Sequence, residues 1–337
     1  MAERGQPPYR AEQVLRWIFQ RGAASFAAMS DLPAALREEL DRTFTIPRLV
    51  PEVVSRSVDG TRKLLFRLEE GRAIESVLIP DPPRLTLCIS SQAGCGMGCE
   101  FCATARLGFQ RHLSSTEIVA QVLAASAELC AGERITNIVF MGMGEPLHNY
   151  DNVVGAIEIL CADWGCNFSS RRITVSTVGL LPQLERLVRE TPVNIAVSLT
   201  ATTNVLRDRL MPVNRKYPVE DLIAVCRELP IPQRRRITFE YVMLEGVNDS
   251  SADAARLVRL LHGVRSKVNL IPFNAFPGSG FRSSSPGAIR RFQEQLLAAG
   301  VNATVRTSRG QDIQAACGQL AAAERVRAAA AEARLHG

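Results

Sequence analysis

The spacing of hydrophobic positions changes along the first quarter of the chain. In residues 9–22, YRAEQVLRWIFQRG, apolar side chains recur at helical spacing. Residues 30–44, SDLPAALREELDRTF, predict a second helix with Ser30 as its cap and a proline in its first turn. Residues 52–80 carry short β-type runs interrupted at DG and EEG, which are typical of hairpin turns. We therefore expect a small helical head followed by a β-rich connector.

From residue 84 onward, β-type apolar runs alternate with helical patterns. One of these helices, residues 114–132, opens with a Ser-x-x-Glu capping box and is expected to end at Gly132. Alternating strands and helices indicate βαβ units and a parallel sheet, and six repeats favour a whole or partial barrel. In such barrels the chemistry lies on the loops that follow the strands. The expected strands cover residues 84–90, 135–141, 172–177, 193–199, 237–243, 267–272 and 301–306.

These patterns divide the chain into four expected parts. They are a helical N-terminal accessory domain (1–48), a β-rich connector (49–82), an α/β partial (β/α)6 TIM-type barrel (83–318) and an Ala-rich tail (319–337). We expect the tail to form a surface helix or a frayed end.

Composition and charge predict where the protein is located and which kind of partner it suits. No apolar run approaches the eighteen or so residues of a membrane span, and MAERGQPPYR lacks an apolar signal core, so we expect a cytoplasmic protein without a membrane partner. Lys and Arg total 40 against 34 Asp and Glu, a net charge of +6, which fits a polyanionic partner without requiring one. The basic clusters are Arg106 with Arg111, Arg171 with Arg172, Arg207 with Arg209, Arg215 with Lys216, Arg234 to Arg236, and Arg306 with Arg309.

The nine cysteines fall into two groups. Cys130, Cys161, Cys166 and Cys226 lie in expected helices and are interpreted as small core residues. The second group is Cys88, Cys95, Cys99, Cys102 and Cys317. After the first barrel strand, CGMGCEFC places three of these, Cys95, Cys99 and Cys102, within eight positions.

This close spacing favours a 4Fe-4S cluster. Three thiolates on a glycine-rich loop can bind three irons and leave the fourth open for a substrate. Structural zinc is the competing interpretation, but it wants four ligands, and the nearest candidates for the fourth are His112 and Cys88.

Long, ordered motifs along nearly the whole chain carry a family resemblance. They include YRAEQVLRWIF, ESVLIP, LTLCISSQAGCGMGCEFCATARLGF, IVFMGMGEPLHNYDNV, LRDRLMPVNRKYP, NLIPFNAFPG and RGQDIQAACGQLA. In these motifs the chain resembles the radical S-adenosylmethionine (SAM) superfamily and, within it, the adenine carbon-2 methyltransferases of RNA.

The resemblance implies two cofactors, one 4Fe-4S cluster and SAM. Cys95, Cys99 and Cys102 would hold the cluster, whose open iron would bind SAM. The residues expected to contact SAM are Gly144 and Glu145 in GMGEP, then Ser176, Ser198, Leu199, Thr200 and Asn274. Thr200 stands where many relatives have a histidine, so that contact would differ here.

The resemblance also implies a methyl-carrying cysteine, Cys317, and a redox partner for it, Cys88. Carbon 2 of adenine is electron-poor and not nucleophilic, so the methyl group would arrive as a radical. One SAM would methylate Cys317 and a second would provide the radical that activates that methyl group. The product would leave as Cys317 and Cys88 form a transient disulfide. Glu75 matches the position of the proton acceptor, and Cys88 is the alternative base.

The implied substrates are adenosines in the peptidyl transferase region of 23S rRNA and on the 3′ side of the tRNA anticodon. The adenine would have to leave its stack, and the head would help to hold the folded RNA. An external low-potential electron donor is also implied, and we expect a monomer. Two alternatives stay open: a relative that methylates carbon 8 of the rRNA adenine, and a non-catalytic iron–sulfur protein that binds RNA or transfers electrons.

Overall fold

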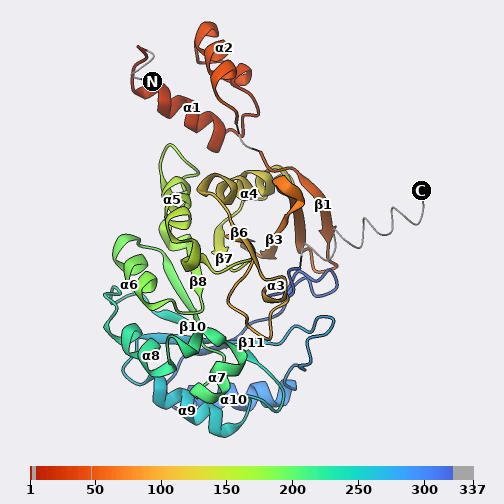
Figure 1. Ribbon diagram of the computed structural model, residues 1–337, viewed down its shortest axis with the longest axis vertical. Helices are drawn as coiled ribbons and strands as arrows, with labels where there is room; N and C mark the ends of the chain where they lie inside the picture. The colour runs from red at the N-terminus through yellow and green to blue at the C-terminus, as the bar shows by residue number, and fades with distance from the viewer. Residues whose placement is uncertain (2–4, 47, 322–337) are drawn as a thin grey trace, which may run out of the picture.

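A ten-stranded mixed sheet, seen in a computed structural model that describes residues 1, 5–46 and 48–321, forms the body of the protein (Figure 1). Seven consecutive strands of this sheet are parallel, and they match the seven runs expected from the sequence. The sheet ends at β1 on one side and β12 on the other, which confirms a partial barrel. The parallel strands are β4 (Arg84–Cys88), β7 (Asn137–Phe140), β8 (Ile173–Thr177), β9 (Asn194–Ser198), β10 (Ile237–Met243), β11 (Ser266–Pro272) and β12 (Ala303–Val305).

Helices connect these strands and pack outside the sheet (Figure 1). The capping box of α4 is confirmed, because the Ser114 hydroxyl accepts from the Glu117 N–H. The expected end at Gly132 is wrong: the chain leaves the helix after Ala127, and the Glu133 carboxylate accepts from the Cys130 N–H in the following turn. The connecting helices are α3 (Ala103–Arg106), α4 (Ser115–Ala127), α5 (Tyr150–Cys161), α6 (Leu181–Glu190), α7 (Asn204–Leu210), α8 (Val219–Glu228), α9 (Ser251–Leu261) and α10 (Pro286–Ala298).

The connector continues the barrel sheet. β1 (Pro51–Arg56), β2 (Arg62–Arg67) and β3 (Ala73–Asp81) pair antiparallel in order, and β3 pairs antiparallel with β4. The two hairpin turns fall at the DG and EEG positions, as the sequence predicts. Five of the six residues of β2 are buried, because the hairpin is covered by the Cys317 loop, here defined as residues 310–321, and by α4.

The head is a pair of helices with a small core of its own. α1 (Tyr9–Phe19) and α2 (Ala34–Thr43) surround buried side chains such as Phe26, Met29 and Leu36. It meets the body at the end of α1, where the Gln20 amide donates to the Asp163 carbonyl. The expected cap of Ser30 is wrong: α2 begins after Pro33 and has no side-chain cap. The division of the chain at residues 48 and 82 stays a prediction.

Two other expectations concern the termini and the cysteines. The predicted tail helix lies, from residue 322 onward, outside the described residues. In the part of the chain that is described, no helix has the length and apolar character needed to cross a membrane. Cys226 is a buried core residue as expected, whereas Cys130 is exposed in the turn after α4, which corrects its assignment to the core.

Candidate functional site

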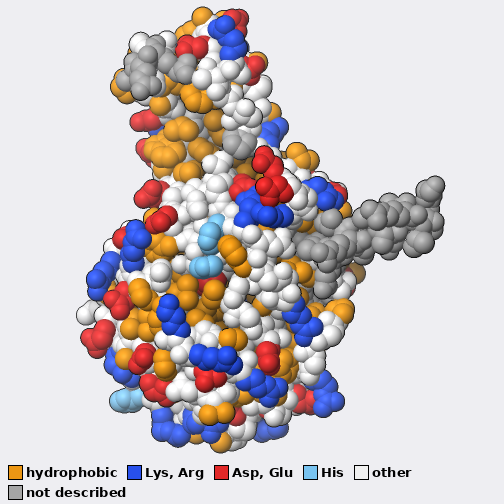
Figure 2. Space-filling view, in the orientation of Figure 1, with side chains coloured by type: hydrophobic (Ala, Val, Ile, Leu, Met, Phe, Trp, Pro, Cys, Tyr) orange, Lys and Arg blue, Asp and Glu red, His pale blue; other side chains and the backbone are white. Residues whose placement is uncertain are grey.

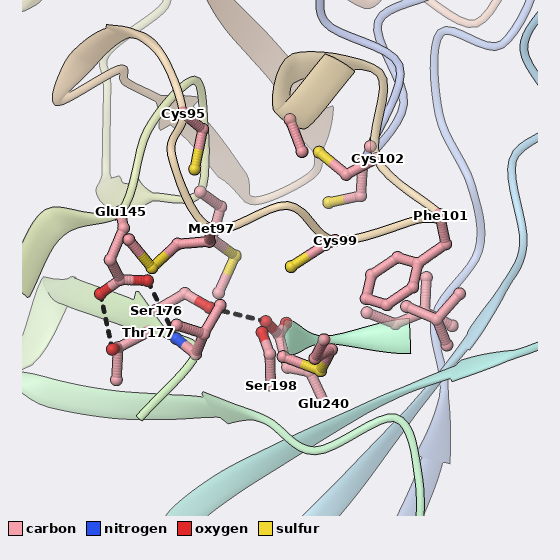
Figure 3. Close-up of a pocket in the computed structure, with 18 of the residues that line it drawn as sticks. Cys95, Met97, Cys99, Phe101, Cys102, Glu145, Ser176, Thr177, Ser198 and Glu240 are labelled. Atoms are coloured by element: carbon pink, nitrogen blue, oxygen red, sulfur yellow. Dashed lines mark hydrogen bonds between the residues drawn. The ribbon is translucent and has the colours of Figure 1, made fainter. Parts of the chain in front are cut away.

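Four cysteine side chains line one cavity of about 150 Å³ at the carboxyl ends of the barrel strands (Figure 3). Three of them lie on residues 95–102, named here the cysteine loop, and the fourth is Cys317. A two-stranded sheet that the sequence did not predict, β5 (Gln92–Gly94) and β6 (Phe109–His112), frames this loop. Burial raises the pKa of Cys95 to about 12 and that of Cys99 well above its ordinary value. Free of metal, these groups are therefore thiols, and a cluster would displace their protons.

The donors at this cavity, three thiols from one loop, suit a cluster better than a zinc ion completed by His112 or Cys88. Figure 3 shows Cys95, Cys99 and Cys102 around the same space, above the floor formed by Ser176 and Ser198. The two residues considered as a fourth zinc ligand lie elsewhere. His112 packs against His148, with ring centroids 5.0 Å apart, and its Nδ1 lies 3.1 Å from the Gln92 amide nitrogen. Cys88 lines a different cavity.

Glu145, in the loop after β7, is held firmly at the wall of the cysteine cavity. Its carboxylate accepts from the Thr177 hydroxyl at 2.6 Å and from the Val178 N–H at 2.9 Å, and its side chain caps the turn that follows by accepting from Leu147 N–H. Burial raises the pKa of Glu145 to about 7, against the lowering effect of these hydrogen bonds. A cationic ligand in the cavity would favour its charged form.

Gly144, which the sequence predicts only as a SAM contact, is also constrained to be glycine by packing. Its φ is +103°, and a Cβ at this position would lie 2.6 Å from the Gln92 Cβ. The glycine therefore allows the loop after β7 to pack against β5. It also lines the cavity, so the backbone of this position is available to a ligand.

Of the other residues expected to contact SAM, some line the cysteine cavity and some do not. Ser176, Ser198 and Asn274 line the cysteine cavity, whereas Leu199 and Thr200 are fully buried and are not among its lining residues. Thr200 has φ +55°, and its carbonyl accepts from the Asn248 amide. Leu199 and Thr200 therefore lie behind the wall of the cavity, and contact of SAM with Ser176, Ser198 and Asn274 stays a prediction.

A second cavity, of about 590 Å³, occupies the interior of the barrel and is named here the lumen. Cys88, at the end of β4, lines it together with polar and basic residues. Burial, and next the Cys317 thiol, raise the pKa of Cys88 to about 12. Burial also raises the pKa of Cys317, and the Arg306 guanidinium opposes that rise. Both cysteines are free thiols in this structure, and their expected transient disulfide stays a prediction.

Cys317 lies where the two cavities meet. It lines both, and so do four other residues: Met141, Glu240, Ile271 and Asn274. The Asn274 amide donates to the Cys317 carbonyl at 3.1 Å, so a residue expected to contact SAM also fixes the backbone of the expected methyl carrier. The Gly318 carbonyl accepts from the Ala103 N–H at 2.7 Å, next to Cys102. The cysteine loop and the Cys317 loop are therefore directly joined.

Sequence reasoning missed Glu240 and misread Arg207. Glu240 accepts from Ser176 at 2.8 Å and lies 3.9 Å from Arg306, so it links the two cavities. A charged residue within the apolar strand ITFEYVM was a signal for it. Arg207, expected in a basic surface cluster, is fully buried and donates to the carbonyls of Val178 and Ser198.

Glu75 is not brought to either cavity. It is fully buried on β3, 3.0 Å from the Lys63 ammonium, and it accepts from the Ala321 N–H. The lining residues of the cysteine cavity and of the lumen do not include it.

Comparison with known proteins defines the class first. A family model for the radical SAM superfamily matches residues 89–258, which carry the cysteine loop and most of the barrel. A solved structure described as a radical SAM methyltransferase from Sphaerobacter thermophilus superposes with a TM-score of 0.91 at 48% identity, covering 95% of each chain. The fold and the three-cysteine site are thus those of a radical SAM protein, a class that uses a 4Fe-4S cluster and SAM.

Closer relatives define the family. The dual-specificity RNA methyltransferase RlmN of Geobacter sulfurreducens is 56% identical over 94% of this chain and 87% of the relative. The protein of the same name from Syntrophobacter fumaroxidans is 54% identical over 94% and 93%. A model of the ribosomal RNA large subunit methyltransferase N-terminal domain matches residues 1–46. The chain belongs to the family of dual-specificity RNA methyltransferases within the radical SAM superfamily.

Proposed function

We propose that the protein methylates carbon 2 of adenosine in RNA, with Cys317 as the carrier of the methyl group. The observation that supports this most strongly is the position of Cys317 at the junction of the cysteine cavity and the lumen. A side chain that lines both spaces can accept a group from one and present it to the other. The substrates we propose are 23S rRNA and tRNA, in keeping with the names of the relatives and of the N-terminal family model.

Each cavity has a distinct task in this proposal. Cys95, Cys99 and Cys102 would hold the cluster, and Glu145 with the Gly144 backbone would bind the ammonium group of SAM. When bound, the cluster and SAM supply a carbon-centred radical able to remove hydrogen from a methyl group, with the electron drawn from an external low-potential donor. The lumen would receive the flipped adenine, because it is the larger and more polar space and contains Cys88.

Cys317 would take its methyl group by simple displacement. The thiol loses its proton, the sulfur bonds to the methyl carbon, and S-adenosylhomocysteine leaves. Arg306 supports this step because its charge favours the thiolate against the effect of burial.

Cys88 would serve the last steps on the substrate side. It lines the lumen with Cys317, so we propose it, rather than Glu75, as the group that takes the ring proton and then pairs with Cys317. Because burial raises its pKa to about 12, Cys88 is a thiol in the resting protein and would have to lose its proton before it could act as this base. In the release step the Cys88 sulfur would bond to the Cys317 sulfur as the bond from Cys317 to the methylene carbon breaks, and the methylene would take up a proton to become the methyl group. The remaining unpaired electron would pass to the external electron carrier, and a cellular thiol reductant would then restore the two cysteines.

The test is anaerobic reconstitution followed by incubation with SAM, a reductant and either 23S rRNA fragments or tRNA. Nucleoside mass spectrometry is expected to find 2-methyladenosine with the wild type and none with Cys317→Ala. A product of 8-methyladenosine would contradict the proposed position, and 2-methyladenosine from Cys317→Ala would contradict the proposed carrier. Cleavage of SAM by an intact cluster, without methylation of any RNA, would instead remove RNA as the substrate.

A further inference from the structure

The Cys317 loop is held at both flanks by one buried ion pair of the connector. The Lys63 ammonium, on β2, donates to the Gln314 carbonyl at 3.0 Å, three residues before Cys317. The Glu75 carboxylate, on the neighbouring β3, accepts from the Ala321 N–H at 3.0 Å, four residues after it. The two side chains are 2% and 0% exposed and lie 3.0 Å apart. Together they bracket the segment that carries the thiol.

The turn between β1 and β2 attaches the Cys317 loop at a second place. Asp312 accepts from the Ser57 hydroxyl at 2.6 Å and from the Val58 N–H at 3.2 Å. Asp59 accepts from the Gly310 N–H at 2.9 Å. The start of the Cys317 loop is thus fixed to the turn between β1 and β2.

These contacts explain how one cysteine is kept between two cavities. β12 ends at Val305, so the loop that follows it is not paired into the sheet. Side chains of the connector therefore add to the backbone bond between Ala103 N–H and the Gly318 carbonyl in fixing its position. A buried charge without a partner is costly, so a fully buried Lys–Glu pair that also binds two backbone groups of the loop fixes its geometry strongly. Neither Lys63 nor Glu75 lines the cysteine cavity or the lumen, so neither reaches a ligand there.

We propose that Lys63 and Glu75 are positioning residues, which hold the Cys317 loop at the junction of the two cavities, and that Glu75 does not take a proton from the substrate. This inference rests on the proposed function for the importance of Cys317. The placement of the loop can be tested without any RNA, SAM or cluster.

The first experiment measures alkylation of Cys317 in the cluster-free protein. Iodoacetamide labelling, followed by peptide mass spectrometry, reports how accessible the half-buried Cys317 thiol is, with exposed Cys130 as an internal reference. The test variant is the double change Lys63→Met and Glu75→Met, which leaves no unpaired charge. The control is Glu52→Gln on β1, whose side chain is 40% exposed.

The double variant is expected to fold and to label Cys317 at least about tenfold faster than the wild type, the shift that follows from losing a charge-assisted hydrogen bond at a loop flank. Glu52→Gln should label as the wild type does. Thermal unfolding checks that the double variant is folded. A folded double variant in which Cys317 labels at the wild-type rate would overturn the positioning role.

The second experiment separates positioning from proton transfer, using Glu75→Gln. Glutamine still accepts a hydrogen bond from the Ala321 N–H but cannot take a proton at neutral pH. If Glu75 removed the ring proton, the substrate would stay covalently joined to Cys317 after the methylene carbon adds, because that bond breaks only once the proton leaves. We expect methylated RNA and no RNA linked to Cys317 with Glu75→Gln. Accumulation of linked RNA on methylation-competent protein would overturn the proposal and return Glu75 to catalysis.

The outcomes of these two experiments can be told apart from a failure of the proposed function. If RNA were not the substrate, no variant would yield methylated or linked RNA, yet the alkylation result for the double variant would still decide the positioning role.

Discussion

The cysteine loop and the Cys317 loop both bring thiols to the same place, but they are built in opposite ways. The cysteine loop is framed by β5 and β6, and its three thiols line a single cavity. The Cys317 loop follows the last strand, is anchored by side chains of the connector, and brings one thiol to two cavities. The difference indicates two tasks. One loop is shaped to hold a cofactor still, and the other to let a single sulfur serve two spaces.

The two cavities that these loops line also differ, in volume and in charge. The cysteine cavity has a volume of about 150 Å³ and the lumen one of about 590 Å³. The lumen carries Arg84, Lys267 and Arg309 on its walls. On the outer surface, Figure 2 shows basic side chains spread over one face of the barrel rather than gathered in one patch. Cations within a substrate space suit a phosphate backbone. The comparison supports the proposal that the cofactors occupy the cysteine cavity and the nucleotide the lumen.

The largest expected effect is that of removing one thiol from the cysteine loop. Cys99→Ala removes one of the three proposed ligands, so reconstituted iron and sulfide content should fall to a small fraction of the wild type, and RNA methylation should be lost. Alkylation of Cys317 in the cluster-free protein should change far less, because Cys99→Ala leaves in place the connector side chains and the Ala103 N–H that hold the Cys317 loop. Full cluster content in Cys99→Ala would show that this thiol is not a ligand.

The second effect concerns the pH dependence of the Cys317 thiol. Burial raises its pKa above the ordinary value, so the thiolate is the minor form at neutral pH and its fraction rises with pH. Alkylation of Cys317, and its methylation by SAM, should accelerate by up to about tenfold for each pH unit between roughly 7 and 9. Rates measured across that range check this. A rate that levels off near pH 7 would mean a thiol activated in the resting protein.

A smaller effect is expected at the wall of the cysteine cavity. Glu145→Gln removes the charge proposed to pair with the SAM ammonium, and affinity for SAM should fall by about ten to a hundredfold. Because the pKa of Glu145 is about 7 in the free protein, binding of a cation should release a proton near that pH, and affinity should decline as the pH falls below it. Calorimetry in buffers of different ionisation enthalpy measures the proton. Binding without proton release in the wild type would place the ammonium elsewhere.

The smallest effect lies at the start of the Cys317 loop. Gly310 has φ +66°, and a Cβ there would lie 2.8 Å from the Thr61 and Ala315 side chains. Gly310→Ala should therefore cost about 1–3 kcal/mol locally and speed Cys317 alkylation by a few fold. Gly300→Ala is a suitable control, because its φ of +77° is similar but no atom lies within 4 Å. Equal alkylation rates in the two variants would show that close packing at Gly310 does not hold the loop.

The fold could be predicted from the sequence because each barrel strand is an apolar run bounded by a helix with a recognisable start. The meeting of Cys95, Cys99 and Cys102 at one cavity could be predicted as well, since their spacing is local; that they hold the cluster stays a prediction. Leu199, Thr200 and Glu75 could not be placed in this way, because a match to a motif does not say whether a side chain faces a cavity or supports its wall. Short strands such as β5 depend on pairing with a distant segment. Arg207 was misread because carbonyl groups from three separate loops are needed to bury it.

The central claim is that Cys317 carries the methyl group from one cavity to the other, and a preloading measurement tests it most directly. Protein carrying an unlabelled methyl on Cys317 is given RNA, reductant and SAM with a deuterated methyl group, and the first turnover is analysed by mass spectrometry. The account predicts that the first methylated adenosine contains the unlabelled carbon from Cys317 and that label enters only in later turnovers. Labelled methyl groups in the first product would contradict it.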